Sequence, residues 1–402
     1  MIDVPLNPVV TRESAAVVFG VIAAQIIGGL FAQMSPFVVA GMMDGLGLSE
    51  RDAGIVAAVE LLFLAVTAIT VAPVLPWLPN RLVCLFAVGL TLLAQAASFF
   101  VEQWLGLVAL RGLSGIGEGA LYALSLSVVA YHFRNPERVF GYLQVVWALG
   151  SIPLFIVAGE VTAAFAHRGI IALLCALTLV LAPLLLLVPN CPPLQRRKAG
   201  RDSGTLVPLQ GALLLMAIFL YVAVSAALYA FSAPIGARAG LDTAAVGYTL
   251  TLASLVGFVG AGASTVLNLR WGRVIPIAAS FIGYVLVALA LCLWQNATAF
   301  AVALVGSVVL YYFSMPYLFG LTAAIDRAGR WAAAAGSAYL LGFAAGPLAG
   351  GAVIAAAGYQ PLAAICVGAI AGAGALVMVV VTQGLEGRAE NLVASGPSPS
   401  ED

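Results

Sequence analysis

The chain of 402 residues is strongly apolar, with 63% hydrophobic and only 8% charged residues. This composition excludes an ordinary soluble globular domain and predicts an integral membrane protein. The formal net charge is zero, so no basic or acidic face for nucleic acid is expected. Five scattered cysteines and two histidines lack metal-ligand spacing, and neither a metal nor a cofactor is expected.

Runs of about 20 apolar residues, long enough to cross a bilayer, are separated by charges or turn-forming residues. Lipid offers no partner to backbone N–H and C=O groups, so these spans must be helical. The predicted spans are 14–40, 52–75, 81–101, 105–130, 138–165, 168–188, 210–231, 242–267, 273–294, 299–323, 331–357 and 359–383.

The distribution of arginine and lysine predicts the orientation of these spans. With a cytoplasmic N-terminus, thirteen of the 17 basic residues fall in inner loops and tails and three fall outside. The positive-inside rule therefore favours cytoplasmic termini and supports an even number of twelve spans. Arginine greatly outnumbers lysine and alanine is abundant, which suggests a bacterial inner membrane.

The longest connector predicts how the chain is divided. Residues 189–209 contain three prolines and a basic cluster, and we interpret them as a cytoplasmic linker. The linker separates a bundle of six helices at 1–188 from a second one at 210–383. Residues 384–402 end in a polar run rich in Ser and Pro and are predicted to be a disordered cytoplasmic tail.

The two halves share an internal repeat. A Gly-Leu-Ser sequence at 47–49, followed by Gly54, recurs as Gly-Leu-Asp at 240–242, followed by Gly247, at an offset of 193. Other residues recur at an offset of 192: Arg81 and Arg273, Arg138 and Arg330, Gly150 and Gly342. The matches predict a duplicated unit, hence an all-α membrane protein of two pseudo-symmetric bundles. Transporters built in this way bind substrate at the midplane between the repeats.

Charged residues inside the spans are candidates for function. Arg111 and Glu118 are the only charges between Leu105 and Val129. Seven residues are two helical turns, so both side chains share one face at a separation of about 10 Å. A charge in hydrocarbon costs at least about 2.5 kcal/mol, which is tolerated mainly where it serves a purpose. Glu60 is the third carboxylate within a span.

Two glycine-containing motifs resemble those of a known family. Arg111 with Gly115 and Gly117 is similar to the fourth-helix motif of the major facilitator superfamily, and residues 346–351, Gly-Pro-Leu-Ala-Gly-Gly, resemble its fifth-helix motif, although here in span 11. The resemblance covers nearly the whole chain. It implies a secondary transporter in which spans 1, 4, 7 and 10 line the cavity. Spans 2, 5, 8 and 11 would then form the moving contact between the halves.

The chain departs from the family pattern in places that bear on its substrate. Span 5 keeps only Gly-Ser-Ile-Pro at 150–153, and the loop after span 2 keeps only Pro-Asn-Arg at 79–81. A full motif in span 5 is typical of drug-exporting antiporters, so its weak form disfavours that assignment. The Asp-Gly-x-Asp signature of aromatic-acid symporters is absent from span 1.

The intramembrane charges lead to a hypothesis for energy coupling. Glu118 would carry the coupling proton, and Arg111 would modulate it or bind an anionic group of the substrate. Glu60 would pair with Arg111 or act as a second proton site. Across spans 1 and 4 we expect Gln25 to face Glu118 and Gln33 to face Arg111. The alternative is a structural lock of span 4 onto span 1 or span 2.

Residues for substrate contact and for conformational change follow from the same organisation. Tyrosine offers a flat apolar ring with a hydrogen-bonding tip, although packing is the alternative role. The predicted substrate-binding residues are Gln25, Gln33, Arg111, Tyr122, Tyr221, Ser225, Tyr311 and Tyr312. The predicted conformational residues are Arg81, Arg273, Gly150, Gly342, Gly346, Pro347 and Gly350.

The pattern as a whole predicts a monomeric, proton-coupled secondary transporter for a small organic solute with an anionic or aromatic group. A proton-driven multidrug or metabolite exporter is the alternative. No Gly-rich loop of the Walker kind occurs, which disfavours direct ATP-driven pumping. A membrane-embedded enzyme would need a clustered nucleophile or metal set, and a transporter-like sensor would need an output domain; neither is evident in the sequence.

Overall fold

The computed structural model describes residues 15–133, 136–190, 208–267, 270, 272–325 and 330–394. Within these ranges the secondary structure is helical. The helices of the first half are α1 (Ala15–Leu46), α2 (Glu50–Val71), η1 (Leu75–Trp77), α3 (Asn80–Phe100), α4 (Trp104–His132), α5 (Pro136–Leu181) and η2 (Ala182–Leu187). Those of the second are α6 (Pro208–Ala230), α7 (Ser232–Arg238), α8 (Thr243–Leu267), α9 (Val274–Leu293), α10 (Ala297–Ile325), α11 (Arg330–Ala357) and α12 (Tyr359–Ala394).

Helix α5 contains two of the predicted spans. Its backbone is broken at Ala166, where φ is 49° and ψ is −134°, a conformation that alanine rarely adopts. Just beyond the break, a Cβ at Gly169 would lie 2.4 Å from the carbonyl oxygen of Val161, so the chain reverses tightly there. The segments before and after Ala166 correspond to the predicted spans 138–165 and 168–188. The eleven long apolar helices of the described ranges therefore make twelve crossings.

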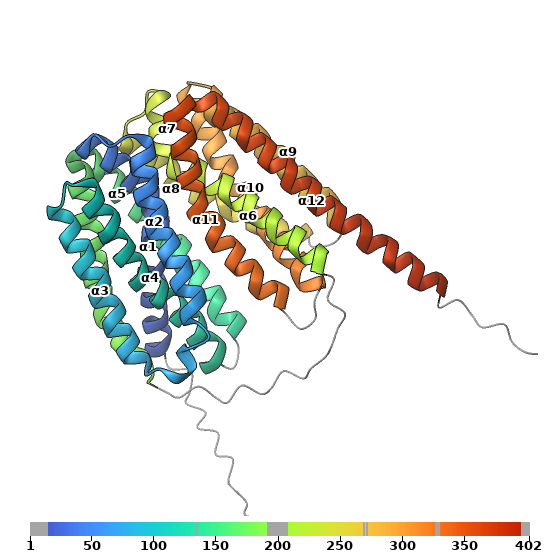
Figure 1. Cartoon of the computed structure of the whole chain (residues 1–402), viewed down its shortest axis with the longest axis horizontal. Coiled ribbons are helices and arrows are strands. Elements are labelled where there is room, and N and C mark those ends of the chain that lie inside the picture. Colours follow the sequence, from blue (N-terminus) through green and yellow to red (C-terminus); the bar gives the residue numbers. More distant parts are fainter. Residues whose placement is uncertain are drawn as a thin grey trace, which may run out of the picture.

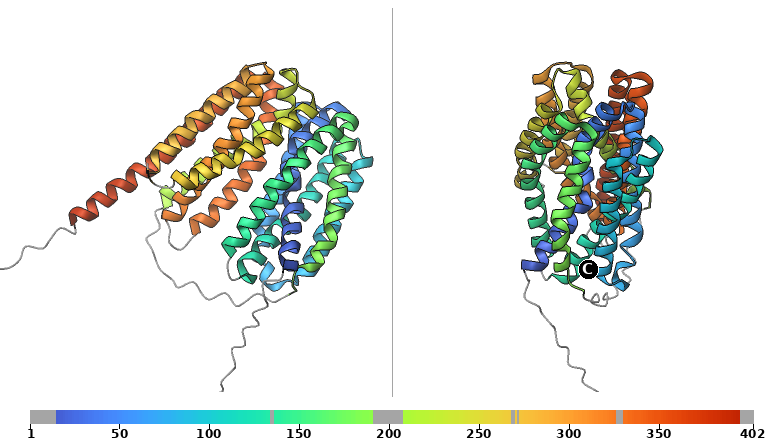
Figure 2. Two further views of the ribbon diagram at one scale, coloured as in Figure 1. Left: turned by 180° about the vertical axis from the view of Figure 1, so that it is seen from behind. Right: turned by 90° about the vertical axis from the view of Figure 1, so that its left-hand side faces the viewer.

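The helices form two bundles that meet at one end, as predicted. In Figure 1 the bundles approach each other at the end where α7 lies and diverge toward the end where α1 and α6 begin. The rear view in Figure 2 shows the same divergence. Contact between the bundles runs mainly through α2 against α11 and α5 against α8. The larger hydrophobic cluster also crosses this junction and includes Phe37 and Phe155 of the first bundle and Phe231 of the second.

Glycines allow the two bundles to touch at their closed end. A Cβ at Gly54 of α2 would lie 2.5 Å from the carbonyl oxygen of Pro347 in α11, and one at Gly351 would lie 2.4 Å from the carbonyl oxygen of Glu50. In the α5–α8 contact, a Cβ at Gly247 would lie 2.6 Å from the carbonyl oxygen of Phe155. Gly54 and Gly247 are repeat mates, so the duplication has produced equivalent close contacts on both sides of the junction.

The C-terminal boundary differs from the sequence prediction. Helix α12 runs to Ala394, so the expectation of disorder is wrong for residues 384–394. Leu, Glu, Arg and Ala in this segment are good helix formers and extend the last span beyond its apolar part. The remaining residues of the predicted tail, 395–402, and residues 191–207 of the predicted linker lie outside the described residues.

Candidate functional site

A cluster of polar side chains is buried inside the first bundle. Glu60 of α2 and Arg111 and Glu118 of α4 have no exposed surface. Glycines of the family motif bring the three helices together. A Cβ at Gly115 would lie 2.2 Å from the carbonyl oxygen of Glu60, and one at Gly117 would lie 2.3 Å from Oγ1 of Thr91 in α3. The motif thus places α2 and α3 directly against the charged helix.

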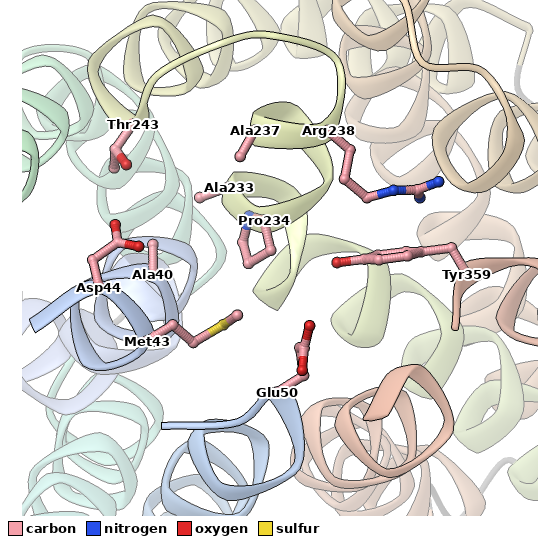
Figure 3. A pocket seen from close by; sticks show the side chains of 10 residues that line it. All are labelled: Ala40, Met43, Asp44, Glu50, Ala233, Pro234, Ala237, Arg238, Thr243 and Tyr359. Atoms are coloured by element: carbon pink, nitrogen blue, oxygen red, sulfur yellow. The ribbon is translucent and has the colours of Figure 1, made fainter. Parts of the chain in front are cut away.

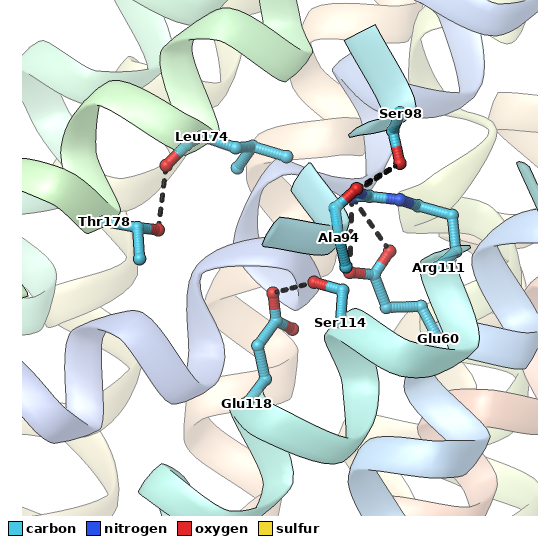
Figure 4. Close-up of polar contacts among 8 residues, drawn as sticks. All are labelled: Glu60, Ala94, Ser98, Arg111, Ser114, Glu118, Leu174 and Thr178. Atoms are coloured by element: carbon cyan, nitrogen blue, oxygen red, sulfur yellow. Dashed lines mark hydrogen bonds and ion pairs between the residues drawn. The ribbon is translucent and has the colours of Figure 1, made fainter. Parts of the chain in front are cut away.

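Arg111 points toward α2 and α3 (Figure 4). Its Nη1 lies 3.4 Å from Oε1 of Glu60, which is one of the predicted pairings. Its Nη2 donates hydrogen bonds to Oγ of Ser98 at 2.9 Å and to the carbonyl oxygen of Ala94 at 3.4 Å. The expectation that Arg111 faces Gln33 across spans 1 and 4 is therefore wrong. The helix is turned so that the guanidinium meets the carboxylate of α2 and the polar groups of α3.

Glu118 has a different set of neighbours. Oγ of Ser114, one turn earlier in α4, donates a hydrogen bond to its Oε1 at 3.2 Å. Glu60 and Arg111 are the charged groups of the described residues that interact with it. Gln25 accepts a hydrogen bond from Ser125, so its expected pairing with Glu118 is also wrong. With both carboxylates ionised, Glu60, Glu118 and Arg111 together carry one net negative charge.

Polar residues of α3 complete the cluster, and sequence reasoning missed them. Thr91, Gln95 and Ser98 have no exposed surface, while much of the rest of α3 is exposed. Their spacing of four and three residues places all of them on one helix face, directed toward α4. The hydroxyl of Thr91 and both polar atoms of Gln95 have no hydrogen-bond partner among the described residues. That spacing in an apolar span was the signal available in the sequence.

Three further residues of the first bundle were predicted to contact substrate. Gln25 of α1 and Tyr122 of α4 are half-buried neighbours. Gln33 contributes its backbone, since its carbonyl oxygen accepts a hydrogen bond at 2.6 Å from the hydroxyl of Tyr229 in α6. Gln25 and Tyr122 therefore remain candidates for substrate contact, whereas the contact seen at Gln33 joins the two bundles.

Two of the predicted substrate residues belong to the core of the second bundle. Tyr221 of α6 is fully buried, and its hydroxyl accepts a hydrogen bond from Ser314 at 2.8 Å. Its ring packs 5.1 Å from the rings of both Phe281 and Tyr284 in α9. Ser225 donates to the carbonyl oxygen of Tyr221 in its own helix. The prediction of substrate contact for Tyr221 and Ser225 therefore gives way to the packing role, because α6 turns them toward α9 and α10.

The remaining predicted tyrosines, Tyr311 and Tyr312, lie in α10. Tyr312 packs on α8, where a Cβ at Gly257 would lie 2.9 Å from its ring. Half-buried Tyr311 of α10 lies beside Tyr339 of α11. Tyr339 lies near Tyr122 of the first bundle, and its neighbour Leu340 packs against the same hydrophobic cluster as Tyr122. Sequence reasoning missed Tyr339, since a single tyrosine in a span gives no sign of the direction in which it points.

The predicted conformational residues are dispersed. Arg81 is exposed at the start of α3, and Arg273 precedes α9. A Cβ added at Gly150 of α5 would have no other atom within 4 Å. Pro347 meets Gly54 at the junction, as described above. The glycine of span 11 that contacts the other half is Gly351, whereas the predicted glycines of this span pack on their own bundle, chiefly on α6: Gly342, Gly346 and Gly350.

A pocket of about 300 Å³ lies at the closed end between the bundles (Figure 3). The first bundle contributes Asp44 and Glu50, and the second contributes Arg238 and Tyr359. Arg238 places its guanidinium carbon 3.9 Å from the centre of the Tyr359 ring and donates a hydrogen bond to the carbonyl oxygen of Cys292 at 3.1 Å. Both bundles form its walls, so separation of the bundles at this end would open the pocket.

The profile of the Major Facilitator Superfamily matches residues 21–325. The chain belongs to the major facilitator superfamily. Its membership and its apolar helices make it a multi-pass membrane protein and a secondary transporter. A search of curated proteins finds no match.

Solved structures of other transporters share the fold. An inward-facing, occupied bacterial homologue of the human lysosomal transporter Spinster is 14% identical, with a TM-score of 0.71 over 92% of this chain and 97% of the homologue. A variant of the nucleoside transporter NupG is 13% identical, with a TM-score of 0.68 over 92% and 99% of the two chains. At these identities the likeness concerns the fold alone.

Proposed function

We propose that this transporter moves a small organic solute by alternating access and couples its movement to protons, with Glu118 as the proton carrier. The observation that carries the proposal is that the buried cluster holds two carboxyl groups, Glu60 and Glu118, and one cation, Arg111. The guanidinium of Arg111 lies 3.4 Å from Glu60, whereas Glu118 accepts a hydrogen bond from Ser114 and lies beside the carboxyl group of Glu60. An unpaired ion in a membrane interior is costly, and one proton on Glu118 makes the cluster neutral.

The roles of the other charged residues follow from the same geometry. Glu60 acts as the permanent partner of Arg111, and Arg111 tunes the proton on Glu118 through their electrostatic interaction. Because Arg111 is buried and engaged by α2 and α3, it is not available to an anionic substrate in this conformation. The geometry therefore offers no support for an anionic group on the substrate.

Alternating access is supported by the arrangement of the bundles. They diverge at one end and touch at the other through close backbone contacts at Gly54 and Gly247, beside which the ring of Phe231 and the hydrogen bond from Tyr248 to Glu160 also join the bundles. Small residues let the helices of the two bundles approach closely here. The excess of arginine on one side supports cytoplasmic termini in a bacterial inner membrane. A C-terminal reporter that is active only in the cytoplasm tests that orientation.

Proteoliposomes containing the full chain test the coupling. A counterflow screen with organic acids, sugars, vitamins and antibiotics first identifies a transported solute, and an interior pH-sensitive dye then reports proton movement. We expect Glu118→Gln to retain counterflow but to lose accumulation driven by a pH gradient, because the amide cannot exchange a proton. Glu102→Gln, at an exposed ion pair with Arg168, is the matched control and should accumulate solute normally. Solute accumulation by Glu118→Gln in step with acidification would rule out the assigned carrier.

A further inference from the structure

The two bundles face each other through uncharged side chains where they begin to diverge. Tyr122 of α4 lies near Tyr339 of α11, and Leu340, the neighbour of Tyr339, packs against the same hydrophobic cluster of the first bundle as Tyr122. Beside Tyr122 lies Gln25, which accepts a hydrogen bond from Ser125. Gln25, Tyr122 and Tyr339 are each half-buried although each lies within a membrane-spanning helix. This combination of partial exposure and contact between the bundles is expected of residues that line a transport site.

Aromatic rings form the surface contributed by the second bundle. The ring of Tyr339 lies 6.2 Å from that of Phe319 and 6.0 Å from that of Phe343. Tyr311 lies beside Tyr339 and adds a second phenol. Offset and tilted aromatic contacts favour a planar ring as ligand, and the phenol and amide groups can bond to hydroxyl or carbonyl groups.

Charged groups of the spans lie elsewhere. Arg111, Glu60 and Glu118 are fully buried among α2, α3 and α4, with the guanidinium directed to α3. In the second bundle, α10 contains no Asp, Glu, Lys or Arg, and α11 contains none after Arg330. An anionic solute at the Tyr122–Tyr339 surface would therefore be desolvated without a counter-charge. A cation would meet one only when Glu118, one helical turn from Tyr122 in α4, is ionised.

We propose that Tyr122, Gln25, Tyr311 and Tyr339 form a binding site for an uncharged solute that carries a planar ring and hydroxyl or carbonyl groups. The inference deepens the proposed function and rests on it for the transport step. Tyr339 is the specificity-determining residue, because it alone of the four contacts further aromatic rings and also faces the opposite bundle.

Binding to the purified full chain in detergent tests the site without any proton gradient. Three probes share one phenyl ring: phenyl β-D-glucopyranoside is neutral and hydroxyl-rich, benzoate is an anion and phenyltrimethylammonium is a cation. Methyl β-D-glucopyranoside lacks the ring. We expect only the neutral phenyl probe to raise the melting temperature and to bind saturably. Stronger binding of benzoate or of the cation, or no binding of the neutral ring compound, would overturn the proposal.

Variants connect binding to the named residue. Tyr339→Leu removes the ring and should lower the binding affinity for the neutral probe about tenfold, since ring contacts and buried area together are worth about 1.4 kcal/mol or more. Tyr339→Phe retains the ring and should bind within about threefold of the unsubstituted protein. Phe258→Leu, an exposed ring in α8, is the control and should not alter binding. Equal effects of Tyr339→Leu and Phe258→Leu would contradict the assignment.

The outcomes for the two proposals are separable. Binding of the neutral probe together with a Glu118→Gln protein that still couples protons would refute the carrier and leave the site intact. Loss of coupling in Glu118→Gln without preference for the neutral probe would refute the site and leave the carrier intact.

Discussion

The two bundles are repeats of one unit, yet their interiors differ in kind. At the offset of 192 that relates Arg81 to Arg273 and Arg138 to Arg330, Arg111 and Glu118 correspond to Ala303 and Leu310. At the offset of 193 that relates Gly54 to Gly247, Glu60 corresponds to Ala253. The polar face of α3 has likewise become apolar, since Gln95 corresponds to Val287 at the offset of 192. The first bundle holds ions away from lipid, whereas the second presents aromatic rings. The proposed proton site therefore lies within one half of a symmetric scaffold, whereas the proposed solute site uses residues of both halves.

The same repeats remain alike where they touch. Gly54 and Gly247 are mates, and each brings a helix backbone against the opposite bundle. A moving contact between two rigid bodies needs similar geometry on both sides, which explains why symmetry survives at the junction. Buried interiors have no such requirement, because each needs only to satisfy its own polar groups.

The largest effect is expected from breaking the ion pair of the first bundle. Arg111→Leu leaves Glu60 and Glu118 buried without a cation, which should cost about 3–5 kcal/mol of folding stability. The melting temperature of the purified protein measures this loss. Arg81→Leu, at an exposed arginine, should change it little. The double variant Arg111→Leu with Glu60→Leu should recover most of the stability, and failure to recover would show that Arg111 stabilises the fold through α3 instead.

The symmetric junction gives the next largest effect. A valine at Gly54 would clash with the carbonyl oxygen of Pro347, which we expect to destabilise the closed end by about 1–3 kcal/mol. The closed end should then open more often, and a cysteine placed at Met43 in the pocket should react faster with an impermeant maleimide. A tenfold change in rate corresponds to about 1.4 kcal/mol.

Two comparisons sharpen this second prediction. Gly247→Val should produce a similar increase, because its Cβ meets the carbonyl oxygen of Phe155 in the equivalent position. Gly150→Val should produce none, since open space surrounds Gly150. Unequal effects at Gly54 and Gly247 would mean that the two halves of the junction do not move alike.

A smaller effect is expected at the polar face of α3. Gln95→Leu removes a buried amide that has no hydrogen-bond partner among the described residues, so it should stabilise the protein by about 1–3 kcal/mol. If this amide serves Glu118 during proton exchange, accumulation driven by a pH gradient should fall several-fold while the melting temperature rises. Gln103→Leu, exposed before α4, is the control. A lower melting temperature with unchanged accumulation would indicate a purely structural role.

The smallest effect concerns the core of the second bundle. Tyr221→Phe removes the hydroxyl that accepts from Ser314, at a cost of about 1 kcal/mol. Stability should fall slightly, and the apparent KM for a transported solute should not change. Tyr221 is fully buried, so we place it outside the substrate site. A large change in KM would show that it contacts the substrate after all.

Local sequence was enough to determine the membrane-spanning architecture. Span lengths follow from bilayer thickness, so uninterrupted apolar runs predicted the two six-helix bundles, and the repeat at Gly54 and Gly247 predicted their symmetry. The residue types of Arg111, Glu118 and Glu60 identified the ionisable cluster, because charges in apolar runs stand out in any register. The helix past residue 383 was missed because a polar surface helix lacks an apolar signal.

Tertiary structure decided the direction in which each side chain points. The prediction that Arg111 faces Gln33 was wrong because periodicity shows which residues share a face and gives no rotation of one helix relative to its neighbours. Close backbone contacts at Gly115 and Gly117 set that rotation, and their partners on α2 and α3 are distant in sequence. The rotations of α6 and α11 likewise buried Tyr221 and directed Tyr339 toward Phe319 and Phe343, since packing among several helices has no counterpart within any one of them.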